Sequence, residues 1–115
     1  MITVYGLKNC DTCGKALTWL DAEGLEHRFH DVRKDGVGVD TIQGWITACG
    51  WETVLNKRGA TWRGLDNAEK DVVDGTNAAA LMAAHPALIK RPVFEIGGRV
   101  IVGFKDQQKT QIKGG

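Results

Sequence analysis

Two cysteines separated by two residues carry the most distinctive chemistry in this sequence. The motif Cys10-Asp11-Thr12-Cys13 follows a short apolar segment and opens a helical pattern. At the start of a helix, the first cysteine lies against unpaired backbone N–H groups, which favour the thiolate over the thiol. The spacing also lets Cys13 reach back to Cys10 and resolve a mixed disulfide. We therefore predict that Cys10 is a redox nucleophile and that Cys13 is its partner.

Other interpretations of the cysteine pair stay open at this point. The pair could be half of a zinc site completed by Cys49 and a histidine, although the sequence has no second paired-ligand motif. The available histidines are His27, His30 and His85. The pair could instead be small packing residues, or Cys13 could pack on the helix while Cys10 acts alone. We expect Cys49 to be a core thiol, and we predict no metal site.

Arg58 and Pro92 lie in two further segments that could serve a reactive thiolate. Arg58 belongs to the polar stretch Asn-Lys-Arg-Gly. A guanidinium beside Cys10 would stabilise the thiolate and could hold an oxyanion or a carboxylate through two hydrogen bonds. A solvated basic loop is the other interpretation of this stretch. Pro92 follows the basic pair Lys-Arg and suits the first position of a strand, where its missing N–H need not pair.

The first third of the chain predicts a βαβ unit. Ile2–Tyr5 is rich in β-branched and aromatic residues and reads as a buried strand. Apolar residues then recur at helical spacing over 11–23, and Gly24 suits the helix end. Apolar and polar residues alternate over 25–32, as expected of a half-exposed strand. Strand, helix and strand in this order predict that the two strands are parallel.

The middle of the chain predicts a block of helices. The stretch 33–38 is turn material, and Asp40 is the expected N-cap of a helix that ends at Cys49 before Gly50. Further short helices are expected over 51–55 and 67–73, with the polar stretch 56–64 as a loop between them. The last helix of the block is expected over 78–85, capped by Thr76 or Asn77 and ended by Pro86.

The end of the chain returns to strands. Two apolar segments, 92–96 and 99–103, flank Gly97-Gly98 and predict a hairpin, and a final helix is expected over 106–112. The order of elements predicts an α/β, thioredoxin-like fold with a mixed four-stranded sheet. We expect one domain over residues 1–115, with a helical insertion over about 38–86.

Composition narrows the class of protein. The 115-residue chain has a net charge of +1, 43% hydrophobic and 25% charged residues, so it has the balance of a globular protein that binds neither nucleic acid nor membranes. Its first residues do not read as a signal peptide, and no apolar run approaches the length of a membrane span. We expect a cytoplasmic protein, in which a C-x-x-C pair serves redox or metal chemistry.

Three separated motifs resemble the arsenate reductase-like proteins, a family that joins glutaredoxin-coupled arsenate reductases (ArsC) and Spx regulators. The motifs are Tyr5-Gly6-Leu7-Lys8-Asn9-Cys10-Asp11-Thr12, Leu55-Asn56-Lys57-Arg58-Gly59, and His85-Pro86 with Lys90-Arg91-Pro92-Val93. The match spans nearly the whole chain and is closest to the YffB-type branch, often suggested to be glutathione-dependent thiol reductases. The resemblance implies a thioredoxin-like fold with a helical insert.

The resemblance also implies roles for individual residues. Cys10 matches the catalytic cysteine, and Arg58 and Arg91 match two of the arginines that arsenate reductases place around the oxyanion. The bond before Pro92 is expected to be cis, with neighbouring backbone available to an extended thiol substrate. We assign Cys10, Cys13, Arg58 and Arg91 to catalysis, and Asn9, Thr12 and Pro92 to substrate binding.

Three positions depart from the arsenate reductases or resemble the regulators. The third arginine of the oxyanion set would fall at about Val102, and Arg99, three residues away, is expected to point elsewhere. Cys13 resembles the Spx regulators, in which a C-x-x-C pair is oxidised to a disulfide. Gly50 falls where that regulator has a glycine in its contact with the RNA polymerase α subunit.

These observations predict a thiol–disulfide oxidoreductase. We expect glutathione or a glutaredoxin as electron donor, a small-molecule or protein disulfide as substrate, and no bound cofactor. The first alternative is an arsenate reductase that uses the same Cys10. The second alternative is an Spx-like redox-sensing regulator that binds the RNA polymerase α subunit without touching nucleic acid itself.

Overall fold

The computed structural model describes residues 1–114 and divides the chain into two compact units. The first, here called the sheet unit, consists of Met1–Asp35 and of the chain from Arg91 onward. The second, the helical unit, is Gly36–Lys90 and interrupts the sheet unit in the sequence. Its bounds enclose the predicted insertion of 38–86, while the assignment of the whole chain to one domain stays a prediction.

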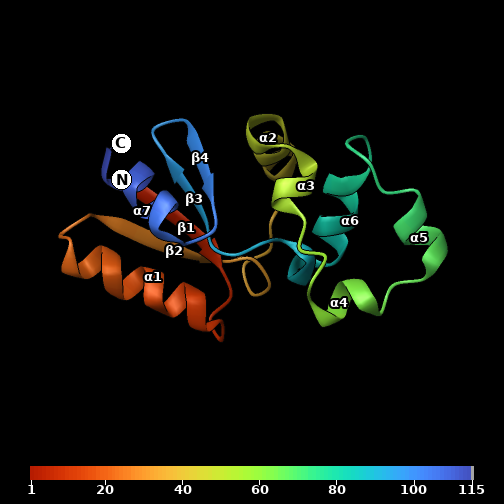
Figure 1. Cartoon of the computed structure of the whole chain (residues 1–115), viewed down its shortest axis with the longest axis horizontal. Helices are drawn as coiled ribbons and strands as arrows, with labels where there is room; N and C mark the ends of the chain where they lie inside the picture. Colours follow the sequence, from red (N-terminus) through yellow and green to blue (C-terminus); the bar gives the residue numbers. More distant parts are fainter. Residues whose placement is uncertain (115) are drawn as a thin grey trace. The chain divides into compact units, whose positions relative to one another are not determined.

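A mixed sheet forms the frame of the sheet unit. Among the described residues it has four strands, in the order β2-β1-β3-β4 (Figure 1). The strands are β1 (Ile2–Gly6), β2 (His27–Asp31), β3 (Val93–Ile96) and β4 (Arg99–Val102). β1 is parallel to β2 and antiparallel to β3, and β3 and β4 form an antiparallel hairpin. The predicted βαβ unit and the α/β, thioredoxin-like arrangement are therefore confirmed.

The hairpin between β3 and β4 turns on two glycines. Gly97 has φ +52° and Gly98 has φ +84°, so both lie in the left-handed region that side chains with a Cβ rarely adopt. Two consecutive residues of this kind match the twist of the flanking strands. The Gly-Gly pair therefore sets the register of the hairpin, in which Val93 lies opposite Val102.

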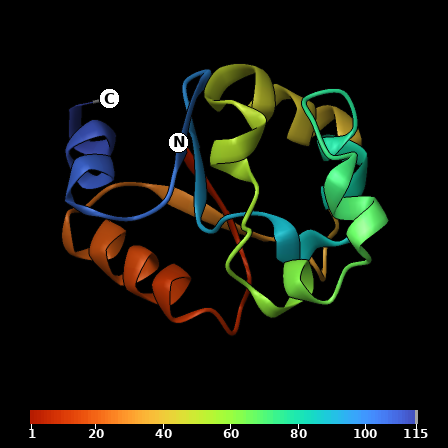
Figure 2. The same ribbon diagram turned by 45° about the vertical axis from the view of Figure 1, so that its right-hand side comes forward.

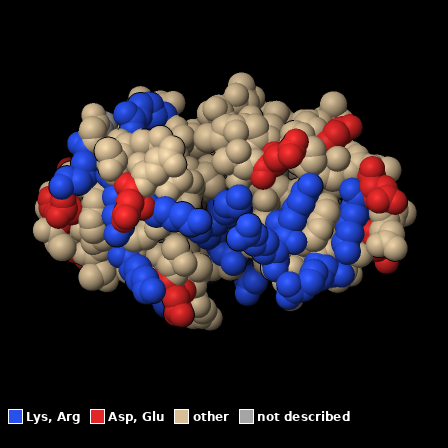
Figure 3. All heavy atoms as spheres, viewed as in Figure 1, with Lys and Arg blue, Asp and Glu red and all other residues tan. Residues whose placement is uncertain are grey.

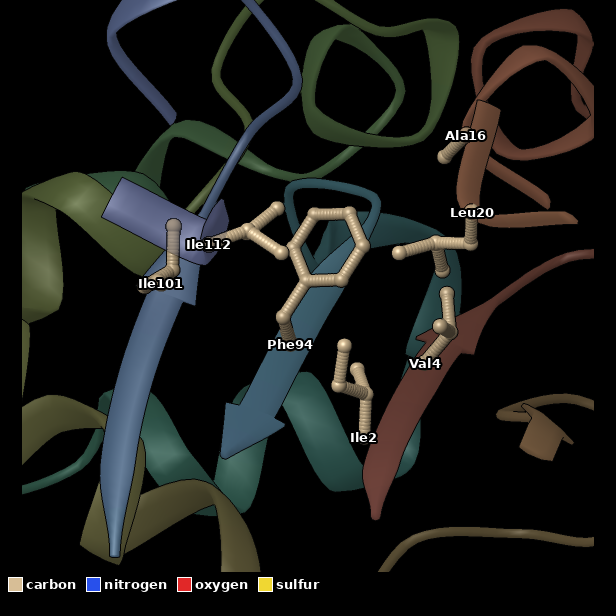
Figure 4. Packing of buried hydrophobic residues seen from close by; sticks show 7 residues of the cluster. All are labelled: Ile2, Val4, Ala16, Leu20, Phe94, Ile101 and Ile112. Atoms are coloured by element: carbon tan, nitrogen blue, oxygen red, sulfur yellow. The ribbon is translucent and has the colours of Figure 1, made fainter. Parts of the chain in front are cut away.

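One apolar core joins the sheet to two helices, α1 (Asp11–Ala22) and α7 (Asp106–Gly114) (Figure 4). Its buried members are Ile2, Val4, Ala16, Leu20, Phe94, Ile101 and Ile112. Ala16 and Leu20 are four residues apart and so share one helix face. Figure 4 shows the ring of Phe94 between the side chains of Leu20 and Ile112. This packing holds α1 against the sheet and so positions the end of the helix at which Cys10 lies.

The helical unit is built from short helices (Figure 2). They are α2 (Val39–Cys49), α3 (Trp51–Val54), α4 (Ala60–Arg63), α5 (Asn67–Asp71), α6 (Ala78–Ala84) and the 3₁₀ helix η1 (Pro86–Leu88). α2 packs against α3 and α6. Ile42 and Trp45 of α2 and Met82 of α6 are among the fully buried side chains of the helical unit. A backbone bridge pairs Leu55 with Ile89. No helix among the described residues has the length and apolar composition needed to cross a membrane.

Three details of the helical block differ from the sequence prediction. Gly38, not Asp40, is the N-cap of α2, and Asp40 instead lies in the first turn, where its negative charge still favours the helix dipole. The expected loop at 56–64 contains the single turn α4. Pro86 does not only end the helix before it: His85 caps α6, and Pro86 starts η1, where its missing N–H costs nothing.

Candidate functional site

Cys10 occupies the N-cap position of α1. Its backbone is extended (φ −91°, ψ 121°), its N–H donates to the carbonyl of Leu7 at 3.1 Å, and its carbonyl accepts from Gly14 at 3.0 Å. The half-buried sulfur therefore lies at the end of the helix where backbone N–H groups point outward and the helix dipole is positive.

The surroundings of Cys10 favour its thiolate. Burial by itself would raise the pKa of Cys10, but hydrogen bonds from the backbone and the thiol of Cys13 act in the opposite direction. A hydrogen bond from Arg91 and the charge of that guanidinium add to them. Together they outweigh burial and lower the pKa of Cys10 below its ordinary value, which is the condition for a reactive cysteine near neutral pH.

Cys13 is the protonated member of the pair. Its side chain is only 1% exposed, and burial is the largest cause that raises its pKa to about 12. The hydrogen bond and the negative charge of Cys10 raise it further, while the backbone of Leu7 and the charge of Arg91 act against them. Glycine is needed opposite this thiol, since a Cβ at Gly6 would overlap the Cys13 sulfur.

Arg91 and Pro92 bring the start of β3 to the cysteine motif. The peptide bond between them is cis, which confirms the prediction. Pro92 is buried, and its carbonyl accepts a hydrogen bond from Gly103 at 2.9 Å. Arg91 is half-buried and reaches Cys10 with its guanidinium. The structure therefore brings Arg91 together with both cysteines of the motif.

A pocket of about 350 Å³ opens beside Cys10 within the sheet unit. Its walls come from the loop before α1, from the segment that follows β2, and from Arg91. Asn9 is exposed and lines the pocket, and its role in substrate binding stays a prediction. Thr12 is exposed on the first turn of α1 and is not part of the wall.

Arg58 belongs to the helical unit, and its surroundings there are well defined. It is exposed, its N–H donates to the side chain of Asn56 at 3.1 Å, and its carbonyl accepts from Arg63 at 2.9 Å. The ammonium of Lys57 lies over the rings of Trp51 and Trp62, at 5.1 and 5.6 Å from their centroids. The catalytic role assigned to Arg58 stays a prediction.

The position of the third family arginine contains no cation. Val102 is a buried residue at the end of β4. Arg99 is exposed at the other end of that strand and donates from Nη2 to the carbonyl of Gln111 at 2.8 Å. Arg99 is thus directed toward α7, as expected.

Sequence reasoning missed three residues of the pocket wall. Asp31, Arg33 and Lys34 were read as the end of a strand and the start of a turn, yet all three line the pocket beside Cys10. Lys8, named from the sequence only as part of the first family motif, lines it as well. A signal was present, because β1 and β2 are parallel neighbours and the segments that follow their carboxyl ends must meet at one edge of the sheet.

Cys49 stands apart from this chemistry. It is half-buried at the end of α2, and burial raises the pKa of its thiol. Within residues 1–114, no three or more histidine, cysteine or acidic side chains gather in a way that could hold a metal ion. Cys49 therefore has neither a lowered pKa nor a ligand cluster around it in the described part of the chain.

Two curated relatives match nearly the whole chain. An uncharacterised protein of Haemophilus influenzae is 44% identical over 108 residues, which cover 94% of this chain and 95% of that protein. The global transcriptional regulator Spx of Listeria innocua is 24% identical over 110 residues, which cover 94% of this chain and 83% of the regulator.

Two solved structures resemble this one in fold and in sequence. The structure named YFFB protein is 44% identical with a TM-score of 0.91, and the match covers 96% of this chain and 97% of that one. An arsenate reductase (ArsC) related protein from Brucella melitensis is 41% identical with a TM-score of 0.77, over 96% and 92% of the two chains. The model of the ArsC family matches residues 5–112, and this chain therefore belongs to the ArsC family.

Proposed function

We propose that this protein is a thiol–disulfide oxidoreductase whose nucleophile is Cys10 and whose electrons come from glutathione or a glutaredoxin. The observation that carries the proposal is the Cys10 sulfur at the start of α1, where Cys13 and Arg91 hydrogen-bond to it and lower its pKa. The pocket beside this sulfur gives a substrate access to it. Membership of the ArsC family agrees with a redox reaction at a cysteine.

In the proposed reaction, the Cys10 thiolate attacks one sulfur of a disulfide. The sulfur–sulfur bond of the substrate breaks, a bond to Cys10 forms, and the electron pair leaves with the other sulfur as a thiolate. Cys13 or glutathione then attacks the Cys10 sulfur and releases the second half of the substrate. Glutathione or a glutaredoxin supplies the two electrons that return Cys10 to its thiolate.

The geometry of the pair suits Cys13 for the second step. In the reduced protein, the hydrogen bond and the charge of Cys10 help to keep Cys13 protonated. Both contributions vanish once Cys10 is part of a mixed disulfide, because the Cys10 sulfur then has no negative charge. Cys13 therefore becomes more acidic at the stage at which it is needed, although burial still acts against its ionisation.

Two cysteine variants test the proposal in a single turnover. With an excess of neutral 4,4′-dithiodipyridine and Cys49→Ala as background, we expect the reduced protein to release two pyridine thiones and to form a Cys10–Cys13 disulfide. Cys13→Ser should release one and retain the other half as a mixed disulfide, which intact mass measures. Cys10→Ser should abolish glutathione-linked disulfide reduction, and unchanged turnover in that variant would refute the proposal.

The other residues assigned from the sequence enter the proposal as anion and substrate contacts. In this proposal Arg58 and Arg91 hold the carboxylate of the substrate, and Asn9 borders the approach to Cys10. Thr12 contacts the substrate from the first turn of α1, outside the pocket wall, and backbone beside Pro92 aligns an extended peptide. Support differs among them, since Arg91 contacts the Cys10 sulfur and Asn9 lines the pocket. For Arg58 the support is its place in the family motif.

Arsenate reduction is the first alternative, and it is supported by the name of the ArsC-related relative from Brucella melitensis. The described site argues for a weaker fit to arsenate, since Val102 stands where a third arginine is expected and Arg99 is engaged by Gln111. Arsenate-dependent turnover with glutathione and a glutaredoxin decides between the readings. We expect little arsenate turnover beside clear disulfide reduction.

A regulatory role is the second alternative, supported by relatives that are named Spx. The C-x-x-C pair and Gly50, whose φ of +91° requires glycine between α2 and α3, are compatible with it. A pull-down with the RNA polymerase α subunit tests this reading. Recovery of the subunit in the oxidised state alone would favour the regulator, and no recovery in either state would remove it.

A further inference from the structure

The pocket beside Cys10 has a basic wall that the thiol chemistry does not require. Besides Arg91, which contacts the reactive sulfur, its lining includes Lys8, Arg33 and Lys34. Basic side chains gather over the loop that follows β2 on the face shown in Figure 3. Within residues 1–114, none of Lys8, Arg33 and Lys34 forms a salt bridge. Their charges are therefore available to a ligand in the pocket.

The single carboxylate of the pocket, Asp31, offsets only part of this positive charge, since four cationic side chains line the same pocket. Oδ1 of Asp31 accepts from the N–H groups of Arg33 and Lys34 at 2.9 and 2.8 Å, and Oδ2 accepts from the N–H of Lys8 at 3.1 Å. Hydrogen bonds from the backbone, that of Lys34 first, lower the pKa of Asp31 despite some burial, and it stays ionised at neutral pH. The charge of Arg33 also contributes to this lowering of the pKa, so Asp31 interacts with one cation of the wall as well as with the backbone amides.

Through the same three hydrogen bonds, the side chain of Asp31 links two loops. One loop, 7–10, carries Lys8 and Cys10, and the other begins at Val32 and carries Arg33 and Lys34. The N–H of Val32 also donates to the carbonyl of Gly6 at 2.9 Å, so the two segments are tied at two places. These hydrogen bonds therefore hold the backbone of Lys8, Arg33 and Lys34 close to the loop that carries the reactive sulfur.

We propose that this pocket selects disulfides that carry a carboxylate close to the reacting sulfur, with Arg33 and Lys34 as the specificity-determining cations and Asp31 as their positioning residue. The inference rests on the proposed disulfide chemistry of Cys10 and adds selection for a carboxylate close to the reacting sulfur, through Arg33 and Lys34. The volume of about 350 Å³ suits a small molecule or the reactive end of a peptide. Guanidinium groups match the planar carboxylate with two parallel hydrogen bonds.

Three small disulfides of different charge test the proposal in one reaction. The reduced Cys49→Ala protein is mixed with 5,5′-dithiobis(2-nitrobenzoate), which carries carboxylates, with neutral 4,4′-dithiodipyridine, or with cationic cystamine. In each case the Cys10 thiolate displaces one thiolate from the probe, so no added reductant is needed. The measured quantity is the ratio of the rate constants for the anionic and the neutral probe, because a change in Cys10 reactivity affects both alike.

The double variant Arg33→Gln with Lys34→Gln is expected to lower this ratio about fivefold, since each exposed charge pair is worth roughly 0.2–1 kcal/mol. Both side chains are exposed, so the fold should tolerate the change. The rate with cystamine should rise relative to the neutral probe. The ratio in the unmodified protein should also fall as NaCl is raised from 0.05 to 0.5 M, because salt screens exposed charges.

Lys105→Gln is the matched control. Lys105 is an exposed cation of the same unit, before α7, and it does not line the pocket. Lys105→Gln removes one positive charge, as the single pocket variant Lys34→Gln does. The rate ratio should fall in Lys34→Gln and stay unchanged in Lys105→Gln. If Lys105→Gln lowers the ratio as much as Lys34→Gln does, the preference comes from the net charge of the protein and the proposed pocket is refuted.

The role of Asp31 is tested by two replacements that differ in what they leave in place. Asp31→Asn can keep the oxygen that accepts from Arg33 and Lys34 but places an amide NH₂ against the N–H of Lys8, and Asp31→Ala removes both oxygens. Both variants lose the same negative charge, so the difference between them reports on positioning, and we expect a lower ratio in Asp31→Ala than in Asp31→Asn. A purely structural residue would lower the melting temperature in Asp31→Ala and give the same ratio in the two folded variants, which would overturn the assignment.

The outcomes separate this inference from the proposed function. If Cys10 reacts with the neutral probe no faster than a free thiol at the same pH, the proposed function fails. If the neutral probe reacts fast and the ratio is insensitive to Arg33, Lys34 and salt, the proposed function stands and the carboxylate pocket is refuted.

Discussion

Replacing Arg91 with glutamine removes the hydrogen bond and the positive charge that reach the Cys10 sulfur from the start of β3. A hydrogen bond to a charged group is worth about 1.5–3 kcal/mol. Because Cys10 is half-buried, we take the lower end, about 1.5 kcal/mol, which corresponds to roughly a tenfold smaller ratio of thiolate to thiol. The pKa of Cys10 should therefore rise in Arg91→Gln.

The reaction rate does not simply follow the amount of thiolate. A more basic thiolate is also a better nucleophile, and with a Brønsted slope of about 0.4–0.5 a tenfold gain in basicity makes it about threefold faster. Below the pKa of Cys10, Arg91→Gln should thus react about threefold more slowly than the unmodified protein, by the same slope. Above both pKa values it should react about threefold faster, so the two pH profiles cross.

The assay is alkylation of Cys10 by neutral iodoacetamide between pH 5.5 and 10 with Cys49→Ala as background. Cys13 remains protonated over this range, since its pKa is about 12. Arg91→Lys, which keeps a charge but loses the fork of donors, should fall between the two profiles. Arg99→Gln is the control, because Arg99 engages the carbonyl of Gln111. Superimposed profiles for Arg91→Gln, or a parallel loss at every pH, would refute the reasoning.

The remaining predictions concern packing, pH-dependent stability and the helical unit. Gly6→Ala should destabilise the fold by about 1–3 kcal/mol through overlap with the Cys13 sulfur, and urea denaturation should show a smaller cost in a Cys13→Ala background. The pKa of Cys13 is raised in the folded state, so its contribution is fully present below the unfolded pKa of about 8.5 and is lost as pH rises toward about 12. The unfolding free energy of the unmodified protein should accordingly decline relative to Cys13→Ala above about pH 8.5, and a difference that is constant from pH 7 to 10 would contradict this. Arg58→Gln should raise KM for a carboxylate-bearing disulfide while the alkylation profile of Cys10 stays unchanged, because the groups that lower the pKa of Cys10 are Cys13 and Arg91.

The sheet unit was predictable because its signals are local. Runs of β-branched residues mark β1, the Gly-Gly pair marks the hairpin, and the helical spacing of Ala16 and Leu20 marks α1. Parallel pairing of β1 and β2 follows from the helix between them. The cis bond before Pro92 had a different basis, since it came from family resemblance and not from the residue itself.

The helical unit was predicted less well because its short elements depend on contacts outside their own sequence. α4 is one turn long, and its polar residues show no helical period. A hydrogen bond from the Arg63 side chain to the carbonyl of Arg58 joins the last residue of this turn to the segment before it. The N-cap of α2 was placed two residues late, since Gly38 gives no side-chain signal and Asp40 gives a strong one that the first turn also accommodates.

In the candidate site, too, the residues with a local sequence signal were predicted, and those that depend on tertiary contacts were missed. The spacing of Cys10 and Cys13 is enough to predict a redox pair from the sequence. Their pKa values shift in opposite directions because the Cys10 sulfur lies at the helix end and the Cys13 sulfur is buried. The basic wall of the pocket could not be predicted from the sequence. Arg33 and Lys34 belong to a turn, and the hydrogen bonds of Asp31 join that turn to the loop before α1. That pairing requires the parallel register of β1 and β2 and cannot be read from residue types alone.

The pKa values of Cys10 and Cys13 are linked, because each thiol is a cause of the shift of the other. The hydrogen bond that lowers the pKa of Cys10 is among the causes that raise the pKa of Cys13, so the reduced protein presents one nucleophile and keeps the other thiol silent. When Cys10 loses its charge in a mixed disulfide, the contribution of that charge to the raised pKa of Cys13 disappears. Any substitution that makes Cys13 a better nucleophile in the reduced state, by weakening its bond to Cys10, must therefore make Cys10 a worse one near neutral pH.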